Sequence, residues 1–177
     1  MRRSAFLKCG GHLIDERDEN GDTPINIACN LFQDEDDYQE NMSRVIDIVK
    51  VLIDHGANSN ISNTGGLAPL HTLALVECES VTVMSAVSTA AELLLDQAGT
   101  DPNPNKVIKP EDGRIDKKNG YNPFSLTYLH DNAPLAELLL AKGASVNQPD
   151  KIPYRPGKNA KIIRDSIDLT AGLQLWR

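Results

Sequence analysis

Residues 61–75 read ISNTGGLAPLHTLAL, in which a glycine pair and a proline precede an apolar stretch interrupted by one histidine, His71. The pattern occurs twice more, because TPINIAC begins at Thr23 and NPFSLTY begins at Asn122. Proline suits the first turn of a helix, and a threonine or asparagine before it can cap free backbone amides. The three stretches therefore predict three helix starts, and we expect the start at Ala68, which lacks a capping oxygen, to be weaker.

Each stretch is followed, after a gap, by an apolar block that leads into a glycine. The blocks are VLIDHGANSN (51–60), LLLDQAGTDPN (93–103) and LLLAKGASVN (138–147), with the same ending in FLKCGGHLID (6–15). Apolar residues recur at helical spacing between positions 45 and 53, and glycine suits the left-handed residue that ends a helix. Each block therefore predicts a second helix, although Ala98-Gly99 shifts the expected Gly-Ala order in the second one.

The spacing of these elements is regular. The glycine of one block lies 12 residues before the next helix start, both from Gly11 to Thr23 and from Gly56 to Ala68. The third unit takes 21 residues from its start to its glycine, and 12 and 21 residues make up the 33-residue period of the ankyrin repeat. The chain therefore resembles the ankyrin repeat family over about residues 6–147.

The resemblance implies an all-α fold, an ankyrin-repeat solenoid of helix-turn-helix units with long insertions. Segments 68–74 and 46–60 match the family pattern best. In this family the residue at the place of His71 hydrogen-bonds across the turn and braces neighbouring repeats, so its expected role is structural; Asn26 and Ser125 hold the same place. The expected units are a half repeat at 1–17, repeats at about 18–62, 63–116 and 117–149, and a basic capping segment at 150–177.

Three stretches exceed the spacing of the family and are read as insertions, at 32–43, 76–87 and 101–120. Long insertions are often functional. We expect the first insertion to lie between the two helices of its unit, with a solvated acidic turn at 34–37 that has a structural role. For the second insertion the structural reading is a lengthened helix at 80–87. For 101–120, which is polar and expected to protrude, a functional and a structural role both stay open.

Composition excludes several classes of function. The chain has 177 residues and a net charge of −7, which makes it a poor general binder of DNA phosphates. Aromatic residues make up 5%, too few for a platform that stacks single-stranded bases. From Lys151 onward six basic residues face two acidic ones, so this tail either lies against the acidic body or binds an external anion.

The sequence shows neither a membrane span nor a regular cysteine pattern. No apolar run approaches the roughly 18 residues of a membrane span, so we expect no membrane insertion. Three cysteines without regular spacing fit reduced thiols, and the expected location is intracellular, either cytoplasmic or nuclear.

Patterns for catalysis or metal binding are missing from the sequence. It contains no glycine-rich phosphate loop and no readable Ser-His-Asp signature. Cys9 and His12 form a pair without a second pair at zinc spacing, and Cys29 falls at the small, packed position of a first helix. We therefore expect no catalytic, cofactor or metal residues, and a protein-interaction module rather than an enzyme.

In the ankyrin family, partners usually meet the concave face, which consists of the loop tips and the exposed side of the first helices. Mapped by motif position, the candidate partner-binding residues are Glu19, Asn20, Asp22, Asn30, Thr64, Leu67, Leu75, Lys118, Asn119, Tyr121 and Leu129. Tyr121 is the expected aromatic anchor, since rigid aromatic side chains are typical binding hot spots.

The alternative function is a regulatory or targeting domain of a larger enzyme or channel, favoured by a chain that starts inside a second helix. An adaptor that recruits a ubiquitin ligase ranks lower, because the tail shows no recognisable recruitment box. The sequence does not name the partner, which is expected to be another protein and not a nucleic acid.

Overall fold

The computed structural model describes residues 13–33, 38–77, 80–104, 122–130 and 132–145; within these ranges the side chains of 38–41, 128 and 129 are not described. This part of the chain is helical and contains no strand. Its elements are α1 (Pro24–Asn30), η2 (Leu31–Gln33), α2 (Tyr38–Asp54), α3 (Pro69–Ala74), α4 (Val81–Asp96), α5 (Pro123–Leu129) and α6 (Ala133–Ala141).

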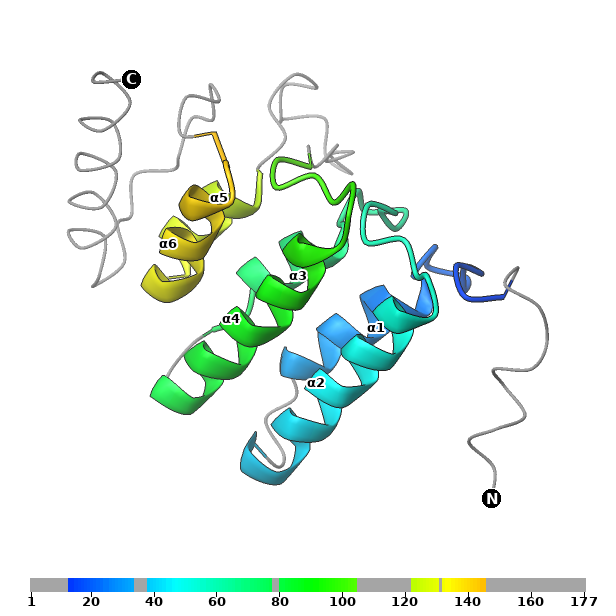
Figure 1. Ribbon diagram of the computed structural model, residues 1–177, viewed down its shortest axis with the longest axis horizontal. Coiled ribbons are helices and arrows are strands. Elements are labelled where there is room, and N and C mark those ends of the chain that lie inside the picture. The colour runs from blue at the N-terminus through cyan, green and yellow to red at the C-terminus, as the bar shows by residue number, and fades with distance from the viewer. Residues whose placement is uncertain (1–12, 34–37, 78–79, 105–121, 131, 146–177) are drawn as a thin grey trace.

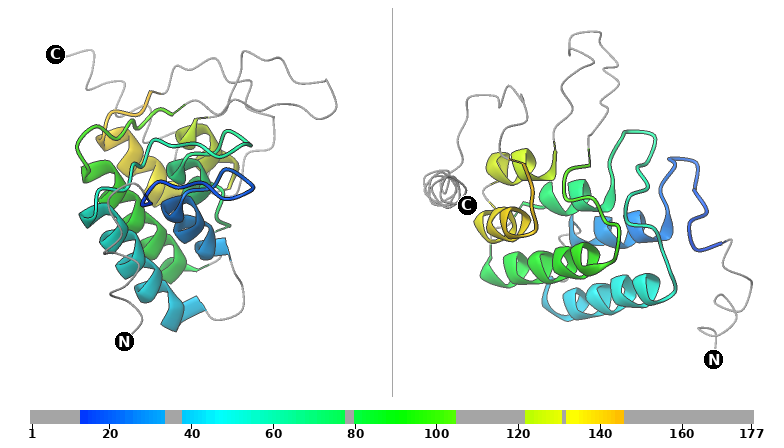
Figure 2. Two further views of the ribbon diagram at one scale, coloured as in Figure 1. Left: turned by 90° about the vertical axis from the view of Figure 1, so that its right-hand side faces the viewer. Right: turned by 45° about the horizontal axis from the view of Figure 1, so that its top comes forward.

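The helices form two parallel layers of a solenoid (Figures 1 and 2). The short first helices α1, α3 and α5 pack side by side in one layer, and α2, α4 and α6 pack side by side in the other. Each first helix also packs against the second helix of its own unit. None of the helices described here is long and apolar enough to cross a membrane.

The core runs between the layers from one unit to the next. The apolar residue after each motif proline is buried, and these residues are Ile25, Leu70 and Phe124. In the second helices Leu94 and Leu139 are fully buried at equivalent places, and the equivalent Leu52 of α2 is half-buried and packs against the same core.

All three predicted helix starts are present, but two of them differ from expectation in how they are capped. Asn122 caps α5 as predicted, because its Oδ1 accepts a 2.8 Å hydrogen bond from the Ser125 amide. Thr23 makes no such cap: its hydroxyl is buried without a hydrogen-bond partner, so that prediction was wrong. At Ala68, where no side-chain oxygen is available, only the reciprocal contact is made: the Nδ1 of His71 accepts from the Ala68 amide at 3.1 Å.

Glycines end all three second helices in the left-handed region. Gly56, Gly99 and Gly143 have φ of +86°, +89° and +91°. Gly99 therefore takes the same place as Gly56 in spite of its shifted sequence context. The extra residue of this unit is absorbed at Gln97, which leaves the helix with extended backbone.

The first two insertions mainly lengthen second helices. Ser80 starts α4 by accepting a 3.2 Å bond from the Val83 amide, so the predicted helix extension is confirmed. The first insertion was expected to lie between two helices, but α2 already begins at Tyr38 and takes up its second half. Residues 34–37 and 105–120, which carry the predicted acidic turn and most of the third insertion, lie outside the described residues.

Candidate partner-binding surface

The loop that precedes α1 closes on itself through a single aspartate. The Asp18 amide donates to the Asp22 carbonyl at 3.0 Å, and the Gly21 amide donates to the Asp18 carbonyl at 2.9 Å. The Asp18 carboxylate also accepts from the amides of Asn20 and Asp22, both at 2.9 Å. The tip, with Glu19 and Asn20 exposed, is thereby held in one conformation.

The loop that precedes α3 repeats this turn 45 residues later. The Asn63 amide donates to the Leu67 carbonyl and the Gly66 amide donates to the Asn63 carbonyl, both at 2.9 Å. The Asn63 side-chain oxygen accepts from the Leu67 amide at 3.0 Å, as Asp18 does one unit earlier. We call the segments 15–22 and 57–67 finger loop 1 and finger loop 2.

The tips of the two finger loops are in direct contact. Thr64 donates to the Asn20 carbonyl twice, from its amide at 3.0 Å and from its hydroxyl at 2.6 Å. The Asn63 side-chain amide donates to the Asp22 carboxylate at 2.8 Å. Gly21 makes this approach possible, because a Cβ at its place would lie 2.9 Å from the Thr64 nitrogen. The two tips therefore form one unit.

A second set of hydrogen bonds links consecutive units at the base of the loops. In each, a side-chain oxygen four residues after the glycine of one sequence block accepts from a backbone amide two residues after the glycine of the next block. The three bonds run from Asn58 N to Asp15 Oδ1 (2.8 Å), from Asp101 N to Asn60 Oδ1 (2.9 Å) and from Ser145 N to Asn103 Oδ1 (2.6 Å). This base ladder fixes the register of one unit on the next.

Hydrogen bonds of buried and half-buried polar side chains hold the second unit in place. His71 is fully buried, so its role at the α3 start is structural. Asn26, at the same motif position, donates to the Ile61 carbonyl of finger loop 2 at 3.1 Å. Gln97 contacts the previous unit as well, donating to the Ala57 carbonyl and accepting from the Ser59 hydroxyl, both at 2.6 Å.

The candidate residues fall into three groups. Glu19, Asn20, Asn30 and Thr64 are exposed, whereas Asp22, Leu67 and Leu75 are half-buried, with Leu75 packed against the core. The structure brings Asn20 and Thr64 together. Lys118, Asn119 and Tyr121 lie outside the described residues, and the side chain of Leu129 is not described.

Sequence reasoning missed the internal contacts of this surface. The base ladder had a readable signal, since Asp15, Asn60 and Asn103 each stand four residues after a block glycine. The contact between Asn20 and Thr64 had none, because an insertion hides the register of the two tips. The exposed apolar residues Ile27 and Leu31 on and beside α1 were also missed.

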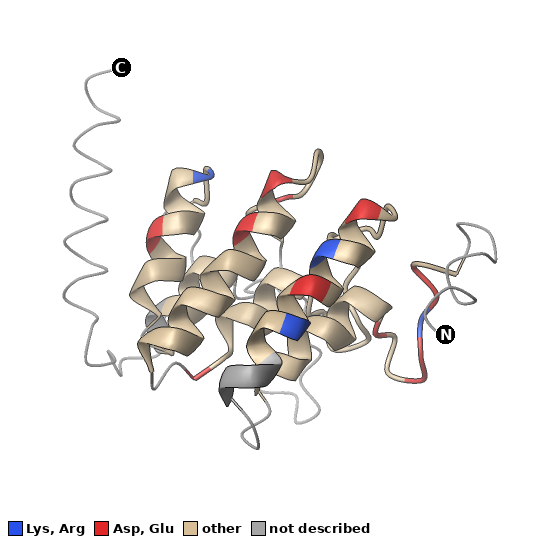
Figure 3. Ribbon diagram, turned by 60° about the horizontal axis from the view of Figure 1, so that its bottom comes forward, with Lys and Arg blue, Asp and Glu red and all other residues tan. Residues whose placement is uncertain are grey.

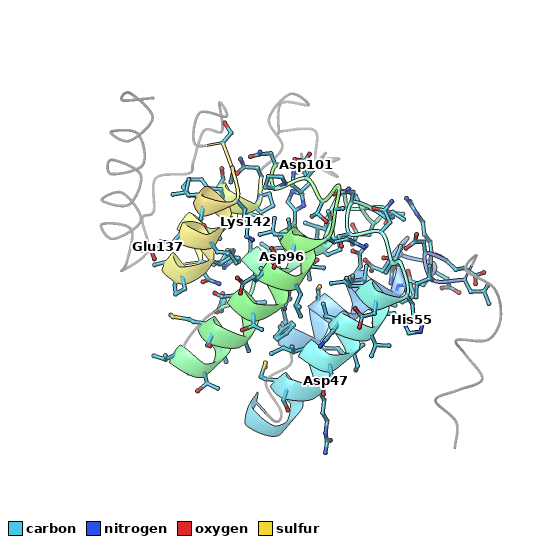
Figure 4. All side chains as sticks on the ribbon, in the orientation of Figure 1. Asp47, His55, Asp96, Asp101, Glu137 and Lys142 are labelled. Atoms are coloured by element: carbon cyan, nitrogen blue, oxygen red, sulfur yellow. The ribbon has the colours of Figure 1, made fainter. Side chains whose placement is uncertain are left out.

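Charge gathers on finger loop 1. It carries five acidic residues against the single base Arg17, and Figure 3 shows this acidic loop at one end of the stack. Elsewhere Asp96 of α4 pairs with Lys142 beyond α6 (Figure 4), and this hydrogen bond raises the Lys142 pKa. Finger loop 1 therefore concentrates negative charge at this end of the stack.

The groups that could carry chemistry are inert or dispersed in this part of the chain. Cys29 is fully buried, and burial raises its thiol pKa to about 12, which removes the nucleophilic thiolate at neutral pH. Among the described residues no three His, Cys, Asp or Glu side chains are grouped so that they could hold a metal ion.

The family model of the ankyrin repeat matches residues 20–64, a segment that starts at one docked tip and ends at the other. Residues 20–64 are therefore similar to an ankyrin repeat. Ankyrin repeats are protein–protein interaction modules. The helical two-layer stack agrees with this all-α solenoid fold.

One curated relative shares a segment with the chain. It is Regulatory protein SWI6 of Kluyveromyces lactis, 41% identical over 59 residues. The match covers 33% of this chain and 6% of SWI6, so this chain is similar to a small part of that protein.

Proposed function

We propose that the chain binds a partner protein through the finger-loop tips and the exposed side of the first helices. The observation that carries this proposal is the docking of finger loops 1 and 2 through Asn20 and Thr64. A surface that is ordered before binding loses less conformational entropy when the partner arrives. Glu19 stands exposed at this tip, and Asn30 lies exposed on α1.

Charge supplies the second part of the proposal. The acidic finger loop 1 attracts a basic partner surface and raises the association rate, an effect that salt screens. The remaining contacts in the proposed interface are Asp22, Leu67 and Leu75, with Lys118, Asn119, Tyr121 and Leu129 from the third unit. Tyr121 stays the proposed anchor. The proposed location is intracellular, either cytoplasmic or nuclear, and the proposal includes no catalytic or cofactor role.

The test is affinity capture from native lysate with mass spectrometry, followed by binding measurements on purified partner. Glu19→Lys with Asn30→Lys alters the proposed face, and Glu92→Lys with Glu137→Lys is the matched control on the outer helices, where both residues are exposed. We expect the first pair to weaken binding by about tenfold or more and the control to have little effect. A partner that binds both variants and the parent equally would exclude this face.

A second candidate function is a regulatory or targeting domain within a larger protein. The similarity to a small part of Regulatory protein SWI6 favours it, because there the matching segment is one piece of a much longer chain. Mapping the natural transcript decides between the two candidates. A reading frame that continues into a catalytic or channel domain supports the second, and a frame limited to these 177 residues rejects it.

A further inference from the structure

The first unit exposes large apolar side chains at one end of the stack. Ile27 and Leu31 are 45% and 39% exposed, and Ile48 and Val51 on α2 are 44% and 42% exposed. We call these four residues the end face. Figure 1 shows α1 and α2 as the last helices of their layers on this side. Of the described residues on α5 and α6, none is an exposed large apolar side chain.

Comparison between units shows what normally covers these positions. Ile27 lies four residues after its motif start, and the equivalent Thr72 of α3 is buried where α1 packs against it. Ile48 corresponds to Ala90 of α4 and Leu135 of α6, which are both fully buried. In the inner units the same positions are covered by the helices of the preceding unit. The end face thus corresponds to a stacking surface, and among the described residues no further helix packs against it.

The third unit carries a surface of the same kind as the end face. At the positions of Ile27 and Ile48 it carries Leu126 and Leu135, which are buried under the helix pair α3 and α4. The second unit has the smaller Thr72 and Ala90 there. The end face therefore resembles the surface on which α3 and α4 already pack, and a helix pair of that kind has the matching shape.

The charge of finger loop 1 indicates which kind of partner surface fits the end face. Finger loop 1 leads directly into α1 and borders the end face with five acidic residues and one basic residue (Figure 3). Two copies of this chain meeting through the end face would bring two acidic loops together, which costs free energy. A neighbour with lysine or arginine next to the loop gains attraction instead.

We propose that the end face binds a two-helix unit of a partner protein, with an apolar stripe against α1 and α2 and basic residues against finger loop 1. This interface shares finger loop 1 with the finger-tip surface, but its apolar contacts through Ile27 and Ile48 do not depend on the docking of the tips. Exposed apolar patches bordered by charge are typical of protein-binding sites. The shape comes from the stacking surface, and the preference for a basic partner comes from the loop.

The probe is a labelled peptide that copies residues 65–98, which include α3 and α4, with Gly65→Lys and Asp96→Lys to place positive charge at the loop end. The unchanged peptide is the charge control. The protein is the full chain, and fluorescence anisotropy measures binding. We expect saturable binding, weaker by about threefold or more for the unchanged peptide, with the difference lost at about 0.5 M salt.

Protein variants locate the site. Ile27→Asp with Ile48→Asp should lower the affinity by about tenfold or more, because both charges enter the apolar contact. Val81→Asp is the matched control, since Val81 is 82% exposed at the start of α4, outside the end face. Thermal melts verify that the variants stay folded. Absence of binding by the parent, or equal binding by the double variant, overturns the proposal.

Two further measurements separate other occupants. Binding that appears only after deletion of residues 1–12 would assign the end face to the chain's own first residues and reject a partner. Sedimentation showing a dimer that Ile27→Asp abolishes would assign it to a second copy, again rejecting the proposal. A monomer whose affinity for the basic peptide is unchanged by the deletion supports it.

Discussion

Replacing Gly21 by alanine tests whether the two finger tips form one unit. Gly21 has φ of +76°, and the left-handed conformation costs a non-glycine residue roughly 1–2 kcal/mol. The new Cβ would also lie 2.9 Å from the Thr64 nitrogen and 3.0 Å from its Cγ2. Because backbone cannot turn aside as a side chain does, the tips must separate. Loss of the two Thr64 hydrogen bonds to Asn20 adds roughly 1–2 kcal/mol at this exposed site.

The matched control is Gly56→Ala, because Gly56 has φ of +86° and open space around its Cβ position. Urea denaturation followed by circular dichroism should give a loss near 3 kcal/mol for Gly21→Ala and roughly 1–2 kcal/mol for Gly56→Ala. Hydrogen exchange should show loss of protection at the Thr64 amide only in the first variant. Equal losses with Thr64 still protected would refute the docking of the tips.

Leu139→Ala should destabilise the chain by about 2–5 kcal/mol, because Leu139 is fully buried, while Val81→Ala leaves the urea midpoint nearly unchanged. Cys29 should resist thiol reagents until the chain unfolds. Burial raises the pKa of the Cys29 thiol from its ordinary value of 9.0 to about 12. Between these pH values only the unfolded thiol loses its proton, so the free energy of unfolding should fall there. A Cys29→Ala variant should lack this part of the decline; parallel pH profiles would contradict it. Asn60→Ala removes the bond from the Asp101 amide and the 2.7 Å bond to the Gly99 carbonyl, and should lower the free energy of unfolding by about 1 kcal/mol in total. Asn60→Asp loses the bond to Gly99 but keeps the oxygen that accepts from Asp101, so it should cost less. Equal costs in chemical denaturation would argue against the ladder.

The helix starts and ends were readable because their cause is local. Proline fixes the first turn wherever it stands, and the glycines that end α2, α4 and α6 need only their own left-handed conformation. Thr23 shows the limit of this reasoning. Whether a hydroxyl turns toward the helix amides depends on its rotamer in the packed core, which the motif does not contain. At Ala68 a different contact is made, since the Nδ1 of His71, three residues further on, accepts from the Ala68 amide.

Contacts between units were not readable. Asn20 and Thr64 are 44 residues apart, and they meet because the extra residues of the first unit partly continue helix α2 and bring the chain back to the same level. The sequence shows the length of an insertion but not whether it leaves the stack as a loop or extends a helix. The exposure of Ile27 likewise depends on which helices surround α1. The fold class was therefore predictable, whereas the way in which the surface is assembled was not.

The lengthened second helices give the outer layer an uneven edge. Aligned on Leu94 and Leu139, α4 starts seven residues before α6, which at 1.5 Å per residue makes a ledge of roughly 10 Å. The ledge is two helices wide and has a small core of its own, in which Val45 of α2 and Val83 and Val87 of α4 are buried. The ledge lies at the end of α2 opposite finger loop 2, so the length of the helix separates it from the docked tips.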